Sequence, residues 1–346
     1  ETDFRDHTIG HLFKRTIAGI DRNRFAVVVV RAGAADDPVA RSIAASADEV
    51  VTLPEHLPKA REMLAEAKLD ALLYTDIGMD PFTYYLAHAR LARLQMVSWG
   101  HPVTTGIEAI DLFVSAEAFD RDGAEPDYTE GLARLPFLLL DWQPEKVDLA
   151  GIERSRLGMS ADGHAYFCAQ SLFKLHPAFD RALGEILRRD KDAVLHFVEG
   201  HRRPWCERIV ARLERALPGA GKRIRFLPRL SGADFIRAQA LADVVLDTPG
   251  FSGGKTSLEG FSMGQPVVAM PSRYLRGRLT YGFYRRLDLD DLVATSLEDY
   301  VEKAVRLGTD ANYRLEAKAR VAERAPRLWG TVESVRAFED LVLSRI

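Results

Sequence analysis

Residues 244–271 read VVLDTPGFSGGKTSLEGFSMGQPVVAMP, and this stretch says most about the fold. The apolar runs at 244–247 and 266–270 are typical of buried strands. Between them, a glycine-rich turn leads into a helix that we expect to begin near Lys255 and Thr256. A helix start after such a turn offers backbone N–H groups and the positive end of the helix dipole. The segment therefore predicts a site for an anion.

Side chains after the turn suit a nucleoside diphosphate. Lys255 supplies a cation, Thr256 a hydroxyl, and Glu259 a carboxylate one helical turn later, where it could accept from ribose hydroxyls. A P-loop is disfavoured, because the residue five positions before Gly254 is Pro249 rather than glycine. A turn that only connects strand to helix remains the alternative.

Composition points to a globular α/β protein. At 346 residues the chain exceeds one typical domain, so we expect two. A net charge of −3 and the lack of a basic cluster with aromatics argue against a nucleic-acid partner. Two cysteines, Cys168 and Cys206, are too few for a disulfide framework. With no apolar run of membrane-span length and no signal peptide visible, we expect no membrane partner and a cytoplasmic location.

Strand and helix patterns alternate along both halves of the chain. Strands are predicted at 25–31, 50–53, 69–74, 95–99 and 111–115, and again at 164–168, 194–198, 223–227, 244–247 and 266–270. Helices are predicted at 10–20, 57–67 and 81–94, and a helical tail at 298–346. Residues 132–148 are interpreted as an interdomain crossing. This alternation predicts two Rossmann-like lobes with parallel sheets and a cleft between them.

Four blocks carry a family resemblance. They are DFRDHTIGHL at 3–12, LLYTDIGMDPFTYYLAHARLARLQMVSWGHPVTTG at 72–106, CAQSLFKLHP at 168–177, and LADVVLDTPGFSGGKTSLEGFSMGQPVVAMP at 241–271. In this order and spacing the chain resembles the catalytic region of glycosyltransferase family 41. That family includes protein O-GlcNAc transferase, the SPINDLY-type O-fucosyltransferases and the HMW-type bacterial N-glucosyltransferases.

The resemblance implies an α/β GT-B fold and an inverting, metal-independent sugar transfer. The donor would be UDP-GlcNAc or another UDP-sugar, used as a substrate with no cofactor, and the acceptor a protein Ser, Thr or Asn side chain. Two alternatives stay open: a degenerate module that binds nucleotide sugar without turnover, and a GT-B enzyme acting on a small molecule or glycan.

The resemblance also implies a donor site in the second half of the chain. Lys174 matches the family lysine that contacts the donor phosphates, while Phe235 could stack on the base or simply belong to the core. Departures from the family at Ser171, Gly232 and Ala238 leave the nucleobase and sugar open. The implied donor-binding residues are Gln170, Ser171, Lys174, Leu230 through its backbone, Phe235, Gly253, Gly254, Lys255, Thr256 and Glu259.

Residues near the acceptor and sugar are expected in the first half. His7 matches the family's active-site histidine, and His101 lies in a GHP turn at a predicted strand end. With Lys174, these two histidines form the implied catalytic set, because a histidine can exchange protons near neutral pH. The remaining candidates on this side are Asp76, Gly78, Thr104, Thr105 and Gly106.

Three parts of the chain are expected. Residues 1–145 would form the acceptor-side lobe, 146–327 the nucleotide-sugar lobe, and 328–346 a helix packing back on the first lobe. The resemblance places residue 1 in the loop after a first strand, so that strand is expected to be missing. It also implies that a helical or tetratricopeptide domain outside this sequence recruits the protein acceptor.

Overall fold

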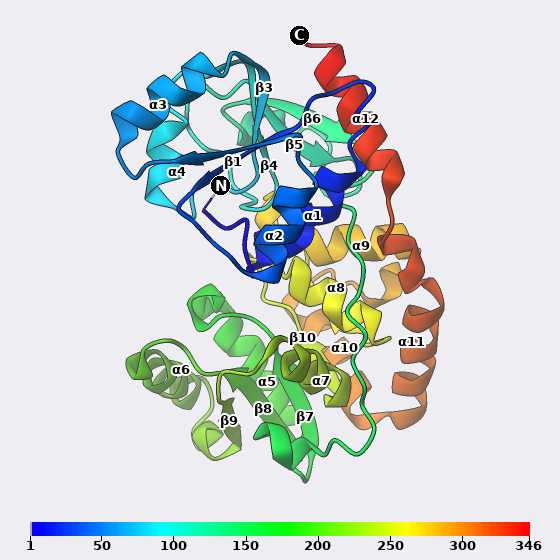
Figure 1. Cartoon of the computed structure of the whole chain (residues 1–346). Coiled ribbons are helices and arrows are strands. Elements are labelled where there is room, and N and C mark those ends of the chain that lie inside the picture. Colours follow the sequence, from blue (N-terminus) through cyan, green and yellow to red (C-terminus); the bar gives the residue numbers. More distant parts are fainter. Residues whose placement is uncertain (1) are drawn as a thin grey trace. The chain divides into compact units, whose positions relative to one another are not determined.

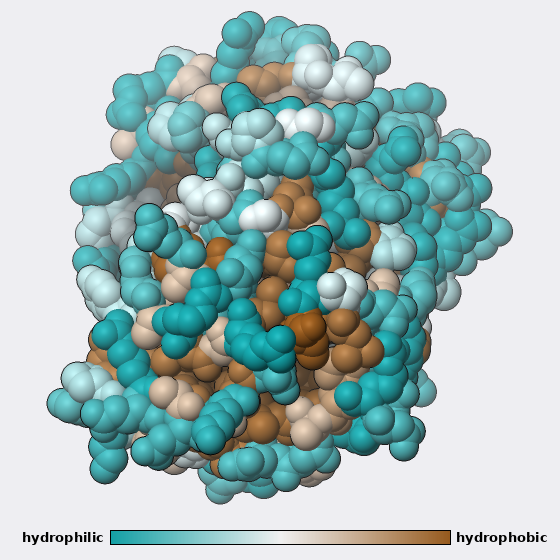
Figure 2. All heavy atoms as spheres, turned by 90° about the horizontal axis from the view of Figure 1, so that it is seen from above, coloured by the Kyte–Doolittle hydropathy of each residue, from teal (hydrophilic) through white to brown (hydrophobic). Residues whose placement is uncertain are grey.

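The computed structural model describes residues 2–346 and divides into two compact units (Figure 1). The first unit combines the chain up to Gln143 with Trp329–Ile346, and the second is Pro144–Leu328. Over the described residues, no helix is both long and apolar enough to cross a bilayer. Hydrophilic residues dominate the face shown in Figure 2, where apolar surface gathers inside a hydrophilic rim.

The first unit contains two parallel sheets. One pairs β1 with β2, and the other has the order β3-β4-β5-β6. The strands are β1 (Val28–Ala32), β2 (Glu49–Leu53), β3 (Leu69–Tyr74), β4 (Ala92–Ser98), β5 (Leu112–Ala116) and β6 (Gly131–Leu135). The helices are α1 (Thr8–Gly19), α2 (Pro38–Ala45), α3 (Leu57–Glu66), α4 (Pro81–Leu86) and α12 (Val332–Leu343).

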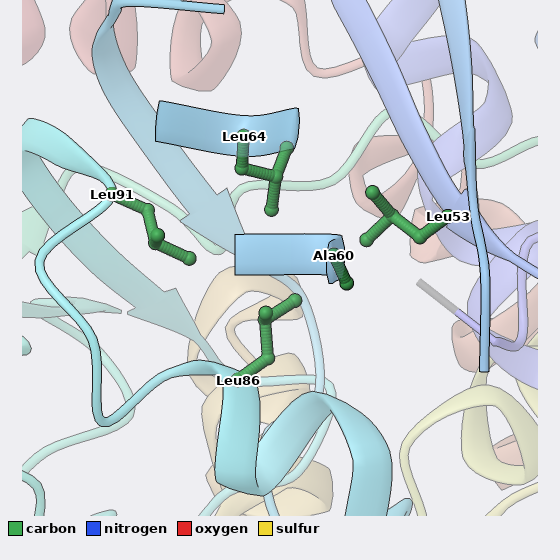
Figure 3. Packing of buried hydrophobic residues seen from close by; sticks show 5 residues of the cluster. All are labelled: Leu53, Ala60, Leu64, Leu86 and Leu91. Atoms are coloured by element: carbon green, nitrogen blue, oxygen red, sulfur yellow. The ribbon is translucent and has the colours of Figure 1, made fainter. Parts of the chain in front are cut away.

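Local sequence explains where several of these helices start. Asp37 and Asp80 cap α2 and α4 by accepting from backbone N–H groups, and a proline follows each at the first helical position. Apolar residues of α3 and α4 then face one another and the neighbouring strands. Figure 3 shows this packing for Leu53, Ala60, Leu64, Leu86 and Leu91.

The C-terminal helix α12 belongs to the first unit. The Thr331 hydroxyl donates to the carbonyl of Leu140, and the rings of Trp142 and Trp329 meet edge to face with centroids 5.9 Å apart. Arg24 pairs with the buried carboxylate of Glu339 at 3.1 Å. The first unit is therefore built from both ends of the chain.

The second unit has one parallel sheet of order β11-β10-β7-β8-β9. Its strands are β7 (His164–Cys168), β8 (Ala193–Val198), β9 (Ile224–Leu227), β10 (Val244–Leu246) and β11 (Val267–Val268). Its α-helices are α5 (Asp180–Arg189), α6 (Arg203–Ala216), α7 (Gly232–Leu241), α8 (Lys255–Ser262), α9 (Leu279–Leu287), α10 (Leu297–Thr309) and α11 (Ala311–Arg324). Strand order reverses between β7 and β10, and ligands of such sheets bind beyond the strand ends at this point.

One prediction about the first unit is wrong, and a second is confirmed only in part. The helix expected at 81–94 ends at Leu86, and β4 begins at Ala92. The side chain of Gln95 stabilises the intervening turn, because it accepts from the N–H of Leu91 and donates to the carbonyls of Ala89 and Ala109.

The expected interdomain crossing at 132–148 contains the boundary between the two units, which falls between Gln143 and Pro144, but the predicted range begins too early. Its first residues belong to β6, which pairs in parallel with β5, and the next four apolar residues are fully buried. A Pro residue after the strand made this apolar run look like a linker, although its burial places it in the core.

Close packing of Gly308 in α10 against Tyr166 of β7 generates a stability prediction. A Cβ on Gly308 would lie 2.5 Å from the Tyr166 Cζ and would contact its hydroxyl oxygen, which donates to Asp190. Overpacking of this kind costs about 1–3 kcal/mol. We expect Gly308→Ala to lower the free energy of unfolding of the second unit by that amount in urea titrations.

A matched control is Gly232→Ala at the start of α7, where an added Cβ meets nothing within 4 Å. This variant should stay within about 1 kcal/mol of the parent chain. Equal stability of the two variants would contradict the packing argument.

Candidate functional site

The glycine-rich turn after β10 is held by a buried carboxylate. Asp247 Oδ1 accepts from the Gly253 N–H at 2.8 Å, and Oδ2 accepts from the Ser252 hydroxyl at 2.7 Å. Asp247 is 4% exposed, and burial raises its pKa above the ordinary value in spite of these donors. The carboxylate therefore fixes the path of the turn that precedes α8.

Hydroxyl groups extend this network under the turn. The Thr280 hydroxyl lies 2.9 Å from that of Ser252 and 2.8 Å from that of Ser257. Gly253 leaves no room for a side chain, because a Cβ there would lie 2.5 Å from two hydroxyl oxygens and 2.6 Å from Gln170 Nε2. The glycine thus lets the turn approach α8 and the end of β7 closely.

The start of α8 has backbone donors without a side-chain partner. Its N-cap is Gly254, and no side chain caps the helix. The N–H groups of Lys255 and Thr256 accordingly lack intrahelical acceptors, as the first amides of any helix do. This geometry supports the predicted anion site, because oriented N–H groups and the helix dipole both favour negative charge.

A polar chain links this helix start to the segment after β7. Lys174 Nζ donates to Gln170 Oε1 at 3.1 Å, and Gln170 Nε2 donates to the Thr256 hydroxyl at 2.7 Å. The Lys174 ammonium also lies 4.5 Å from the centroid of the Phe251 ring. Burial lowers the pKa of Lys174, while the charge of Asp247 opposes that shift. The structure thus brings Lys174, Gln170 and Thr256 together.

Lys255 and Glu259, both expected to contact the donor, form an ion pair with each other. Their side chains form an ion pair across one turn of α8, and Glu259 is 4% exposed. The Lys255 charge is thereby largely balanced within the helix. This pairing weakens the expectation that Lys255 adds a full cation and that Glu259 reaches a ribose.

The other donor-side candidates follow the ends of β7 and β9. Ser171 is exposed, and its carbonyl accepts from the Lys174 N–H at 2.9 Å. Leu230 is half-buried just before the Ser231 cap of α7. Phe235 is half-buried and meets Phe167 of β7 edge to face, with ring centroids 5.9 Å apart. Part of the Phe235 ring therefore packs in the core of the second unit, as the alternative interpretation of this residue expected.

In the first unit, the structure brings His101 beside Gly78. A Cβ on Gly78 would lie 2.8 Å from His101 Cδ2, and the φ of Gly78 is 111°, so both space and backbone favour glycine there. Asp76, 2% exposed, lies in the same segment after β3. Gly100, after β4, packs equally tightly on Thr75 and Ile9, which ties α1 to this edge.

His7 caps α1 at the same edge. Its Nδ1 accepts from the Ile9 N–H at 3.4 Å and lies 3.5 Å from Asp3 Oδ2. The two contacts compete for one ring nitrogen, since the first needs it unprotonated and the second favours a proton there. His11 instead pairs with Asp6 at 2.8 Å, a supporting contact one turn further on.

Thr104, Thr105 and Gly106 make hydrogen bonds to the segment that precedes β6. The Thr104 hydroxyl and the Thr105 N–H both donate to the buried Glu130 carboxylate, at 2.8 and 2.7 Å, and Gly106 donates to the Thr129 hydroxyl. Thr129 and Glu130 lead into β6, at the amino-terminal end of the strand. The donors of Thr104 and Thr105, which the sequence suggested for a ligand, are thus hydrogen-bonded to Glu130.

Three residues of the site were not singled out from sequence: Asp247, Ser252 and Thr280. Asp247 falls at the end of a predicted strand, and its position two residues before Pro249-Gly250 was the available signal. Thr280 lies too far along the chain for any local pattern to connect it with the turn. Among residues 2–346, no group of three His, Cys, Asp or Glu residues is placed to hold a metal ion.

Sequence comparison places these features in a family context. The glycosyl transferase family 41 model matches residues 141–338. The UDP-glucose:protein N-beta-glucosyltransferase of Actinobacillus pleuropneumoniae (strain L20) is 27% identical over 268 residues, covering 75% of this chain and 42% of the relative. A probable UDP-N-acetylglucosamine–peptide N-acetylglucosaminyltransferase SPINDLY of Solanum lycopersicum is 27% identical over 266 residues, covering 73% and 27%. The chain thus spans less than half the length of these relatives.

Solved structures support the fold. An O-GlcNAc transferase mutant of Thermobaculum terrenum superposes with a TM-score of 0.86 at 22% identity, covering 99% of this chain and 65% of the other. Anabaena HepE, solved with UDP and glucose, gives a TM-score of 0.63 at 12% identity, covering 100% and 98%. These likenesses confirm the predicted α/β GT-B fold class.

The Asp247 network generates a prediction for the turn. Asp247→Ala leaves two buried donors, the Gly253 N–H and the Ser252 hydroxyl, without their acceptor, at about 1–3 kcal/mol for each. We expect a lower free energy of unfolding for the second unit and weaker binding of UDP, measured by urea titration and calorimetry.

The exposed Asp192→Ala in the same unit is the matched control and should change neither quantity. Asp247→Asn keeps one acceptor oxygen and should fall between the two. Parent-like stability and UDP affinity in Asp247→Ala would refute the role of this carboxylate.

Proposed function

Because the chain belongs to glycosyl transferase family 41, we propose that it transfers a sugar from a uridine diphosphate donor to a protein side chain. UDP-GlcNAc is the first donor to test, with UDP-glucose next, since the relatives are named for these donors and for a protein or peptide acceptor. The observation that carries the proposal is the polar chain Lys174–Gln170–Thr256 at the start of α8, which no side chain caps.

The proposed chemistry is an inverting displacement with a diphosphate leaving group. Negative charge grows on that diphosphate as the sugar departs, so a preformed positive environment lowers the barrier. Lys174 would supply a cation, and the N–H groups of Lys255 and Thr256 would supply oriented donors. These groups together could balance the diphosphate without a metal ion, and Asp247 would keep the turn in place.

Acceptor-side roles remain part of the proposal. His7 and His101 would lie near the sugar or the acceptor hydroxyl or amide, with Asp76 and Gly78 beside His101. Histidine is the side chain that most readily exchanges a proton near neutral pH, so either residue could take the acceptor proton. The protein acceptor would be recruited by a helical or tetratricopeptide domain elsewhere in the full-length protein.

A lysine variant tests the donor site. In calorimetry against UDP, UDP-GlcNAc, UDP-glucose, GDP, GDP-fucose and ATP, we expect the parent chain to prefer the uridine ligands. Lys174→Ala should weaken that binding and lower sugar transfer by about 10²–10³-fold, the usual loss for one transition-state donor. The exposed Lys191→Ala in the same unit is the control and should match the parent.

Other outcomes separate the alternatives. Uridine binding without transfer to any acceptor would indicate a degenerate binding module. Transfer to free sugars but never to peptides would indicate a small-molecule or glycan acceptor. Unchanged UDP binding in Lys174→Ala would remove the donor site from this position.

The lowered pKa of Lys174 predicts the pH dependence of donor binding. The ammonium attracts the diphosphate only below its pKa, so UDP affinity should fall as the pH rises through that lowered value. The decline should therefore begin below about 10.4, the ordinary lysine pKa. Lys174→Arg should hold its affinity to higher pH, since a guanidinium stays charged. Parallel pH profiles for parent and Lys174→Arg in calorimetry would contradict this role.

A further inference from the structure

An exposed phenyl ring lies directly before Lys174 in the second unit. The side chain of Phe173 is 70% exposed, the largest exposed fraction among the exposed large apolar side chains of residues 2–346. Its neighbour Leu172 is buried, and Lys174 is half-buried, so the segment itself is packed against the unit. A single exposed apolar residue is ordinary on a protein surface, and the neighbours of Phe173 therefore decide what the ring can do.

A second aromatic ring holds Phe173 in place. Trp205, in the first turn of α6, meets Phe173 edge to face, with ring centroids 6.1 Å apart and ring planes at 76°. The backbone at Gly200 packs closely on this pair of segments, since a Cβ there would lie 2.8 Å from Trp205 Cε3 and 3.3 Å from Leu172 Cδ1. The two rings therefore form one fixed aromatic surface.

Basic side chains adjoin the aromatic pair. Arg202 and Arg203 are exposed at the start of α6, and Arg229, which follows β9, donates to His201 Nδ1 at 2.9 Å. Arg203 pairs with Glu207 at 3.2 Å. Over the part of the chain that the structure describes, neither Arg202 nor Arg229 pairs with a carboxylate.

We name this surface the aromatic–basic platform; it consists of Phe173, His201, Arg202, Trp205 and Arg229. Its three segments follow β7, β8 and β9, which are neighbours in the sheet of the second unit (Figure 1). The carboxyl ends of neighbouring parallel strands lie at one edge, so the platform shares that edge with the candidate donor site. Because no single stretch of sequence contains both rings, the cluster emerges only in the folded chain.

Positive charge dominates the platform. Residues 199–208 include three arginines and two glutamates, and Arg229 adds one more cation. The dipole of α6 adds to this potential, because Arg202 is the N-cap and the first turn contains no acidic residue. Cations at the amino-terminal end of a helix are repelled by its dipole, so a negatively charged partner would relieve an unfavourable arrangement.

We propose that the aromatic–basic platform binds the polypeptide acceptor through an acidic segment that also carries an aromatic or other apolar side chain. The two rings receive the apolar side chain, and Arg202 and Arg229 pair with the carboxylates. That the bound peptide is the acceptor rests on the proposed sugar transfer, whereas the binding itself does not.

The position of Phe173 favours an acceptor over an unrelated partner. Lys174 follows it directly and belongs to the polar chain that we propose holds the donor diphosphate. A peptide lying across Phe173 would therefore pass close to the donor. Guanidinium groups bind carboxylates through charge-assisted hydrogen bonds, which selects an acidic segment over a neutral or basic one.

A nucleic acid is the other polymer that uses aromatic rings and cations. Single strands are usually held in a positively charged groove that follows the backbone over several nucleotides. Here the cations without a carboxylate partner are confined to Arg202 and Arg229 on the platform, and the whole chain carries a net charge of −3. These observations favour a short acidic stretch of polypeptide.

Fluorescence anisotropy with four labelled probes tests the proposal. The acidic peptide contains one Ser, one Tyr and several Glu residues, the neutral peptide has Gln in place of Glu, and the basic peptide has Lys there. An oligothymidine of similar length is the fourth probe. The parent chain should bind the acidic peptide at least about tenfold more tightly than the others, and added salt should weaken this binding.

Two variants separate the contributions of the ring and the charge. Phe173→Ser should weaken binding of the acidic peptide about fivefold or more, as loss of an aromatic anchor does. Arg202→Glu should weaken it by a similar factor and strengthen binding of the basic peptide, a reversal that a merely structural role would not produce. UDP affinity should match that of the parent chain in both variants.

Each variant has a matched control in the same unit. Leu315→Ser removes another exposed apolar side chain, 65% exposed on α11. Arg215→Glu makes the same charge change as Arg202→Glu but lies about 20 Å further along α6, at 1.5 Å per residue. Both controls should bind the acidic peptide like the parent chain.

Several outcomes would overturn the proposal. They are equal binding of the acidic and neutral peptides by the parent chain, unchanged peptide binding in both Phe173→Ser and Arg202→Glu, and tighter binding of the oligothymidine. Weaker UDP binding in Phe173→Ser would place the ring in the donor site and would also overturn it. Selective binding of the acidic peptide by a parent chain that binds no UDP would support the platform and contradict the proposed sugar transfer alone.

Discussion

The buried carboxylate of Asp247 is the contact on which the rest of the candidate donor site depends. It accepts from the Gly253 amide and the Ser252 hydroxyl, and so it orders a turn that has no regular secondary structure of its own. Burial makes the charged carboxylate costly, which explains why several donors surround it. Because these contacts fix the turn, they also fix the position of the first amides of α8, which no side chain caps.

Lys174 depends on the same arrangement. Its ammonium is half-buried beside Gln170 and Phe251, and Asp247 is the nearby negative charge that offsets its desolvation. A cation held in a poorly solvated place interacts more strongly with an incoming anion than a lysine in open water. The site therefore keeps its positive charge where a diphosphate would have few competing water molecules.

Sequence patterns predicted the elements well where one physical signal dominates. The strands at Leu69–Tyr74 and His164–Cys168 and the start of α8 at Lys255 fall where the apolar runs and the glycine turn indicated. The boundary of α4 and the strand β6 were missed, because a buried apolar run fits a helix, a strand or a linker equally well. Only the pairing of β6 with β5 decides that case, and pairing is a property of the whole sheet.

Side-chain partners were harder to predict than elements. Lys174 and Thr256 lie together as expected, since both follow strands at the same edge. The Lys255–Glu259 pair was within reach of sequence reasoning, because oppositely charged residues four apart on a helix commonly interact. The hydrogen bond from the Thr105 N–H to Glu130 could not be predicted from sequence, since 25 residues separate the two and no local pattern links them.

The first unit is built from two segments separated by the whole second unit, and this arrangement affects folding during synthesis. The first unit needs α12, which is translated after the whole of the second unit, whereas Pro144–Leu328 is one uninterrupted segment. Domains usually fold in the order in which they are translated. Here all residues of the second unit are translated before α12, so the first unit is completed only when Glu339 becomes available to pair with Arg24.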